Sequence, residues 1–234
     1  MKRLLVLIVA ILLSTTTCAL ANSCPLPPVN TDADIQFSGF EWYVDYPTMM
    51  KMAEAKGIDT LYSMDWFSDS SYNTPHWPIV YSSMPAFAEG DMKCGGSVVL
   101  VDLPDVAGYT AQTLEMYFMW NPETGYTKDY QSPDAIQFYM ARYEIQANDI
   151  KACYEDLVNK LKSLYGESPF EDTKYEVMYS IWVNNQNALI GIGCFNSHVN
   201  LVYMAPNADE KLVAIEELVK GQEIDDAADD FSGL

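Results

Sequence analysis

The sequence predicts an α+β domain in which one or more antiparallel sheets pack against helices. Several segments alternate apolar and polar residues with a period of two, which indicates strands with antiparallel neighbours. Two other segments, 45–57 and 149–165, repeat apolar residues at helical spacing. Hydrophobic residues make up 49% of the 234 residues, which is enough to form a core for a domain of roughly 200 residues.

Residues 1–21 have the layout of a secretory signal peptide. Residues 2–3 are basic, residues 4–13 are apolar and uncharged, and residues 19–21 read Ala-Leu-Ala, which matches an A-x-A cleavage signal. The apolar run is shorter than the roughly 20 residues that a membrane-spanning helix needs. We therefore expect a mature chain that begins at Asn22, works outside the cytoplasm and is not inserted in a membrane after cleavage.

The negative charge of the chain argues against polyanionic partners. The sequence has 33 acidic and 13 basic residues, for a net charge of −20. Loss of the signal peptide removes two basic residues, so 11 basic against 33 acidic residues gives −22. Such a chain is repelled by nucleic acid and by anionic membranes. Cationic partners such as Ca²⁺ or basic peptides stay open, although solubility alone also accounts for this charge.

Five cysteines are present, and Cys18 leaves with the signal peptide. The remaining four permit two disulfides and three pairings. Cys153 and Cys194 fall on apolar faces of predicted regular structure, which favours buried thiols. Cys24 and Cys94 fall in loop-like sequence, and we predict that they form a disulfide.

The first half of the chain predicts one helix and several strands. Residues 22–34 are proline-rich and extended, and the aromatic-rich residues 35–44 predict a strand with a bend at Gly39. Asp45 is an N-cap for a short helix that closes at Gly57. Strands are then expected over 97–103, 113–120 and 135–145, with Ile136, Phe138 and Met140 on one face of the last and Tyr139, Ala141 and Tyr143 on the other.

The second half predicts a similar order. The helix over 149–165 has Asn148 as its N-cap and Gly166 as its C-cap. Strands are expected over 175–183, 188–195 and 199–204, followed by a last helix over 207–220. Residues 222–234 are acidic and poor in apolar residues, which predicts a disordered tail.

A helix followed by three strands thus occurs twice, which predicts sub-units 35–146 and 147–221 within one secreted domain, 22–221. This element order resembles the tandem helix-plus-antiparallel-sheet modules of secreted β-lactamase-inhibitor-like proteins and of small outer-membrane assembly lipoproteins. The resemblance lies in the order of elements, so it transfers no functional residue.

Three short motifs are also notable. They are Phe37-x-Gly39-Phe40-x-Trp42, the helix Tyr154-x-x-Leu157-x-x-x-Leu161-x-x-x-Tyr165-Gly166, and the ending Asp229-Asp230-Phe231-Ser232-Gly233-Leu234. With these motifs the chain resembles a class of uncharacterised secreted proteins from Gram-positive anaerobes. The resemblance implies a fold and an extracytoplasmic location, and no activity.

Signatures of catalysis are scarce. The sequence has no G-x-S-x-G, phosphate-loop or H-E-x-x-H motif and no paired C-x-x-C motifs, so no cofactor or metal is expected. A hydrolase would need one of the two histidines. His198 follows a turn and is expected to be exposed. His76 is the better candidate for a general base, with Asp65 or Asp69 to orient it.

Residues 62–81 concentrate aromatic rings among polar side chains. Rings beside polar groups are typical of surfaces that bind sugars or peptides, and Trp66, Tyr72 and Trp77 are the candidate contacts. A role in packing around an irregular crossover is the alternative for the same rings.

Together these patterns favour a secreted, non-enzymatic binding or interaction protein whose partner is an extracellular protein, peptide or glycan. The alternative is an extracellular hydrolase that acts on a cell-wall or polysaccharide polymer. A purely structural component of the envelope is a third possibility.

Overall fold

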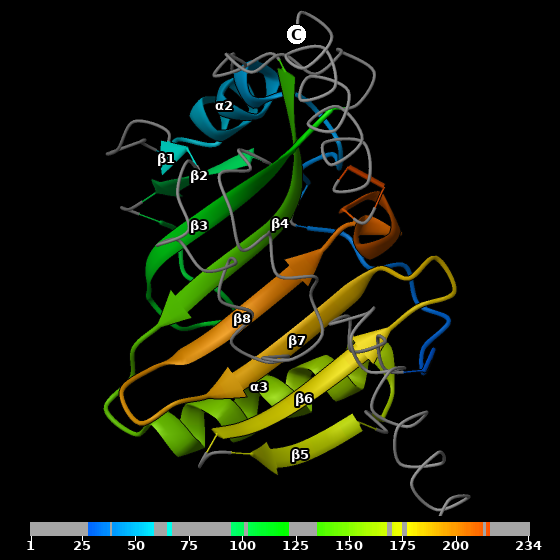
Figure 1. Ribbon diagram of the computed structural model, residues 1–234. Helices are drawn as coiled ribbons and strands as arrows, with labels where there is room; N and C mark the ends of the chain where they lie inside the picture. The colour runs from blue at the N-terminus through cyan, green and yellow to red at the C-terminus, as the bar shows by residue number, and fades with distance from the viewer. Residues whose placement is uncertain are drawn as a thin grey trace, which may run out of the picture.

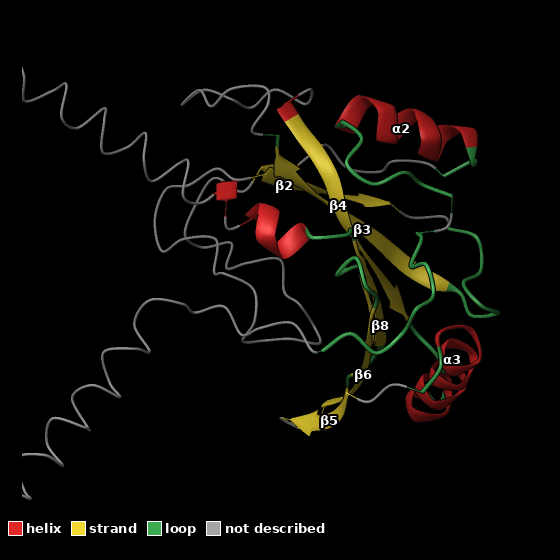
Figure 2. Ribbon diagram, turned by 90° about the vertical axis from the view of Figure 1, so that its right-hand side faces the viewer, coloured by secondary structure: helices red, strands yellow, loops and turns green. Residues whose placement is uncertain are grey.

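The computed structural model describes residues 28–37, 39–58, 65–66, 95–100, 103–121, 135–167, 170–174, 177–212 and 214–215. In these ranges, eight strands form one antiparallel sheet, and helices α2 and α3 lie on the same face of it (Figures 1 and 2). The α+β class expected from the sequence is therefore confirmed.

The sheet has the strand order β1-β2-β3-β4-β8-β7-β6-β5. Each half is a four-strand meander preceded by a helix, and the last strands of the two halves, β4 and β8, pair at the centre. The elements are α2 (Tyr46–Ala55), β1 (Asp65–Trp66), β2 (Gly95–Leu100), β3 (Ala111–Trp120), β4 (Ile136–Ile145), α3 (Ile150–Tyr165), β5 (Phe170–Lys174), β6 (Val177–Val183), β7 (Leu189–Cys194) and β8 (Val199–Met204).

The outermost strand of each half, β1 or β5, was not expected from the sequence. Strand β1 has only two residues, and β5 reads Phe-Glu-Asp-Thr-Lys, so neither shows an apolar alternation. Short or charged edge strands are a common way to keep a sheet from pairing with another chain. The repeat is therefore a helix followed by four strands, where the sequence predicted three.

The strand expected over 35–44 is not formed. The backbone adopts positive φ at Gly39 (74°) and again at Tyr43 (64°), and the Phe37 carbonyl accepts a hydrogen bond of 2.7 Å from the Phe40 N–H. These are turn conformations, and the first favours glycine because it has no Cβ. The segment therefore packs its aromatic rings against the sheet instead of adding a strand to it.

A β-bulge changes the faces of β4. Phe138 pairs with Phe118, but Met140 pairs with the residue before Phe118, so Tyr139 is an extra residue on β4. Beyond the bulge, Tyr143 lies on the same face as Phe138. The strict alternation expected for 135–145 is therefore wrong, because it placed Met140 with Phe138 and Tyr143 on the opposite face.

The helix ends follow the expected capping chemistry, with one shift. The Asp45 side chain accepts a hydrogen bond of 2.8 Å from a backbone N–H of the first turn of α2. At α3 the N-cap is Asp149, where the sequence predicted Asn148. The Asp149 side chain accepts a hydrogen bond of 3.0 Å from the Ala152 N–H. Gly166 ends α3 with φ of 85°, as predicted.

Both cysteines of the second half are free and buried, which confirms the prediction of core thiols. Cys153 lies on α3 and Cys194 on the face of β7 beneath it. Burial raises the pKa of both thiols. A raised pKa lowers the thiolate fraction at neutral pH, so these side chains act as small apolar groups.

Candidate functional site

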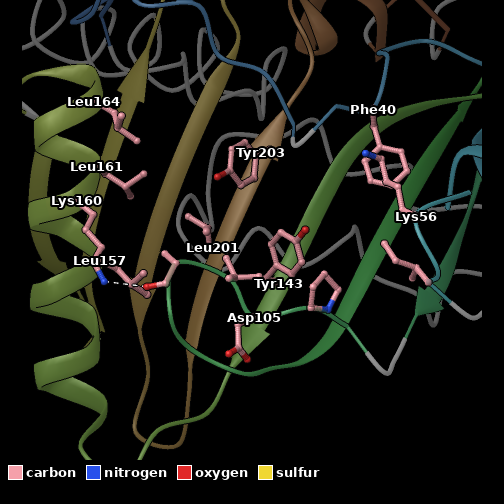
Figure 3. Close-up of a pocket in the computed structure, with 14 residues that line it drawn as sticks. Phe40, Lys56, Asp105, Tyr143, Leu157, Lys160, Leu161, Leu164, Leu201 and Tyr203 are labelled. Carbon is pink, nitrogen blue, oxygen red and sulfur yellow. Dashed lines mark hydrogen bonds between the residues drawn. The ribbon is translucent and has the colours of Figure 1, made fainter.

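A hollow of about 420 Å³ lies on the helix-covered side of the sheet, over the two central strands. Its floor is formed by Tyr143 of β4 and by Leu201 and Tyr203 of β8. Figure 3 shows these three side chains between the leucines of α3 on one side and Phe40 with Lys56 on the other. The volume falls in the range of roughly 300–1,000 Å³ that is typical of small-molecule sites.

One wall is a stripe of leucines on α3. Leu157, Leu161 and Leu164 lie on one side of the helix because their spacings of four and three residues bring successive turns to the same face. Leu157 and Leu161 are buried, whereas Leu164 is 69% exposed. The apolar stripe therefore continues beyond the part that the fold covers and ends in an exposed leucine that lines the hollow.

The opposite wall comes from the residues around α2. Lys56, the C-cap of α2, holds its ammonium 5.1 Å from the centroid of the Phe40 ring, a cation–π contact. A Cβ at Gly39 would lie 3.1 Å from the Lys56 Nζ. Because Gly39 has no side chain, the Lys56 ammonium can approach this turn closely. Ile58 also belongs to this wall.

A hydrogen-bond network fixes the loop 103–107 to α3. Lys160 donates to the Ala107 carbonyl (2.8 Å) and to the Asp156 carboxylate (2.6 Å), and the Tyr109 hydroxyl donates to the same carboxylate (2.9 Å). These hydrogen bonds from Lys160 and Tyr109 lower the pKa of Asp156. The Lys160 ammonium is thus engaged within the protein.

The two lysines of the hollow therefore differ. Among the residues that the structure describes, no carboxylate lies within ion-pair distance of Lys56. At the floor, burial raises the pKa of Tyr203, with Tyr165 and Tyr143 as further causes, so its phenol stays neutral. The hollow offers mainly apolar side chains, a neutral phenol and the Asp105 carboxylate, together with one cation that has no acidic partner among the described residues.

Of the predicted site residues, the structure describes Asp65 and Trp66, and their strand does not lie at this hollow. Asp65 and Trp66 form β1, and β2 and β3 lie between that strand and β4. The other candidates lie outside the described residues, so the signal peptide 1–21, the tail 222–234, Asp69, Tyr72, His76, Trp77 and the Cys24–Cys94 disulfide all stay predictions.

His198 lies at the turn between β7 and β8, as expected, but it is half-buried, where the sequence predicted an exposed side chain. The Asn200 amide donates to its Nε2 (3.2 Å), and its Nδ1 lies 2.9 Å from the Ser197 Oγ. The two ring nitrogens of His198 are thus both within hydrogen-bond distance of neighbouring side chains. The Phe195 ring stacks on the imidazole, with the ring centroids 4.9 Å apart.

In the described ranges, no three acidic, histidine or cysteine side chains are grouped as ligands for a metal ion, and no helix there has the length and apolar character of a membrane span. Comparisons with protein-family models, with curated proteins and with solved structures found no match to this chain. The geometry of the hollow is therefore the basis for a functional argument.

No sequence pattern marks the hollow, because its walls come from separate segments. Residues 40, 56, 58 and 104–107 share no pattern, and the spacing of the α3 leucines predicts only an apolar helix face. One signal was present. Leu164 and Tyr165 extend the apolar face to the last turn of the helix, which leaves more apolar surface than a helix end usually buries.

Proposed function

We propose that this chain is a secreted, non-enzymatic binding protein that holds an apolar ligand in the hollow between α3 and the centre of the sheet. The layout of residues 1–21 supports secretion. The observation that carries the proposal is Leu164, which is 69% exposed at a hollow lined mainly by apolar side chains. Covering such a side chain with a ligand removes apolar surface from water, which favours binding.

The aromatic residues of 62–81 belong to a separate proposal, in which Trp66, Tyr72 and Trp77 contact an extracellular protein, peptide or glycan. The hydrolase alternative depends on His76 with Asp65 or Asp69. Neither requires the hollow, so substitutions in the hollow test the present proposal independently of both.

Leu164→Asp tests the proposal, with Val29→Asp as its matched control. Both side chains are large, apolar and exposed, at 69% and 46%, but only Leu164 lines the hollow. The probe is prodan, a neutral naphthalene dye whose fluorescence rises in apolar surroundings. We expect saturable binding by the wild type and a dissociation constant at least about tenfold higher for Leu164→Asp, because a buried leucine contact is worth about 1.5–3 kcal/mol.

Val29→Asp should bind the dye as the wild type does, and thermal melting should show both variants folded, since both sites are exposed. Equal binding by Leu164→Asp and the wild type would overturn the proposal, as would the absence of saturable binding by the wild type.

A further inference from the structure

We propose that the ligand of the hollow is an alkyl carboxylate, a fatty-acid-like molecule whose chain lies along the leucines of α3 and whose carboxylate pairs with Lys56. This inference rests on the proposed binding function and specifies its ligand class. Three features of the described residues support it: the state of the two lysines, the shape of the apolar wall and the pairing of the floor strands.

The lysines indicate a single anionic group. Lys160 already donates to Asp156 and to the Ala107 carbonyl, at 2.6 and 2.8 Å. The Lys56 ammonium contacts the Phe40 ring, and no carboxylate of the described residues pairs with it. Asp105 also lines the hollow, but its carboxylate already accepts a hydrogen bond of 3.1 Å from the Thr110 hydroxyl. The Lys56 ammonium, which has no acidic partner among the described residues, is therefore the charged group available to an anion brought by the ligand.

One lysine favours a carboxylate over a phosphate. A phosphate carries more charge and three acceptor oxygens, and proteins usually meet it with arginine forks or with several donors together. The hollow offers two lysines, of which only Lys56 is uncommitted. A single negative charge is the better match.

The apolar wall indicates a flexible chain. Leu157, Leu161 and Leu164 extend along one side of α3, and Leu201 lies beneath them in the floor. Figure 3 shows this wall facing Lys56 across the hollow. A molecule that reaches from Leu164 to Lys56 thus needs an apolar body with its charge at one end.

The floor strands argue against a peptide. Strand β4 is paired with β3 and β8, and β8 is paired with β4 and β7. No strand edge is free at the floor to receive a peptide as an added strand. An extended peptide in the hollow would bury amide groups without partners, which is costly, whereas an alkyl chain has no such groups.

The test compares decanoate with decan-1-ol, which share a ten-carbon chain and differ in the head group. Isothermal titration calorimetry at pH 7 would measure both ligands with the wild type, Lys56→Gln, Lys56→Arg and Lys51→Gln. Lys51 is an exposed lysine of α2 that does not line the hollow, so it controls for the change in net charge.

We expect the wild type to bind decanoate about threefold to fivefold more tightly than decan-1-ol, the range of a solvent-accessible ion pair. Lys56→Gln should lose this preference and keep its affinity for the alcohol. Lys56→Arg and Lys51→Gln should keep the preference, and about 1 M salt should reduce it in every protein that shows it.

The outcomes separate the two proposals. If both ligands bind the wild type equally, or if Lys56→Gln keeps the preference, the carboxylate inference fails and the binding function stands. If neither ligand binds while prodan does, the alkyl-chain inference fails. Tighter binding of the neutral peptide acetyl-Leu-Leu-Leu-amide than of decanoate would also overturn it, in favour of a peptide ligand.

Discussion

The two halves of the sheet share one order of elements but are covered in different ways. In the first half, α2 has 10 residues and buries only Met49 and Ala53. In the second half, α3 has 16 residues and buries five side chains. In the first half, the irregular segment 35–44 covers the sheet together with α2. The second half has no corresponding segment among the described residues.

The interactions that hold the two covers in place also differ. In the first half they are contacts between rings, such as the stack of Trp42 on Phe138 with centroids 5.0 Å apart. In the second half they include hydrogen bonds to the helix. The Tyr154 hydroxyl and Ser180 Oγ lie 2.9 Å apart, and the Trp182 indole donates to the Gly166 carbonyl at 2.7 Å.

Two meanders with the same order of strands can therefore be covered by different kinds of segment. The hollow lies over β4 and β8, where the cover of the first half gives way to that of the second. A binding site at this position needs no dedicated element, because it is the space left between two unlike covers.

The ring contacts of the first half should carry the largest effect. Phe138 is fully buried and contacts the rings of Phe37, Trp42 and Phe118. We expect Phe138→Ala to lower the free energy of unfolding by about 3–5 kcal/mol. Urea unfolding, followed by tryptophan fluorescence and by circular dichroism, would measure it. Because both halves share one sheet, the two signals should change together.

The control for this variant is Phe195→Ala, which removes a half-buried ring at the β7–β8 turn. Its effect should be less than half as large. If the fluorescence and dichroism midpoints separate in Phe138→Ala, the two halves unfold independently and the view of a single cooperative sheet is wrong.

The hydrogen bond of the second half should give an intermediate effect. Tyr154→Phe leaves the buried Ser180 hydroxyl without this partner, and we expect a loss of about 1–2 kcal/mol in urea unfolding. Adding Ser180→Ala to Tyr154→Phe should recover part of the loss, because no polar group is then left unpaired. A double variant that is less stable than Tyr154→Phe would show that the hydroxyl finds another partner.

The link between the halves should give the smallest effect and a dependence on pH. Asp156 of α3 accepts hydrogen bonds from Lys160 and from Tyr109, which precedes β3, and these lower its pKa in the folded protein. Since the folded pKa lies below the unfolded value of about 3.9, this stabilisation is complete above pH 4 and is lost as the pH falls through the folded pKa.

Asp156→Asn should therefore be less stable than the wild type at pH 6, and the difference should shrink towards pH 2. Urea midpoints over this pH range would measure it, with Asp34→Asn, an exposed aspartate away from the network, as the control. A difference that stays constant with pH would assign the effect of Asp156→Asn to packing and not to charge.

Most of the regular structure was predictable because it depends on local chemistry. The helices α2 and α3 have apolar faces at helical spacing and capping residues at both ends, and six of the strands have apolar patterns that no other structure explains as well. The strand predicted over 35–44 was wrong. The prediction depended on the aromatic residues of this segment, which favour strands in general. Here the positive φ at Gly39 and Tyr43 turns the same residues into a packing segment.

The site was much less predictable, because the hollow is the space that packing leaves between α3 and the residues around α2. Leu157 and Leu164 are indistinguishable as members of one helical stripe, yet one is buried and the other is 69% exposed. In the sequence Lys56 is a lysine at a helix end, and only the structure shows that it lies beside the hollow, close to the turn at Gly39. Such relations between distant segments leave no trace in a pattern of spacing.

The central pairing of β4 with β8 has a consequence for the order in which the chain is made. Strand β4 is synthesised early, but its neighbour β8 is the last strand of the sheet. Until β8 is available, the first half has an unpaired edge along one of its longest strands, a surface prone to pair with other chains. We therefore expect chains that end before residue 199 to aggregate, and the complete sheet to form only after synthesis has passed β8.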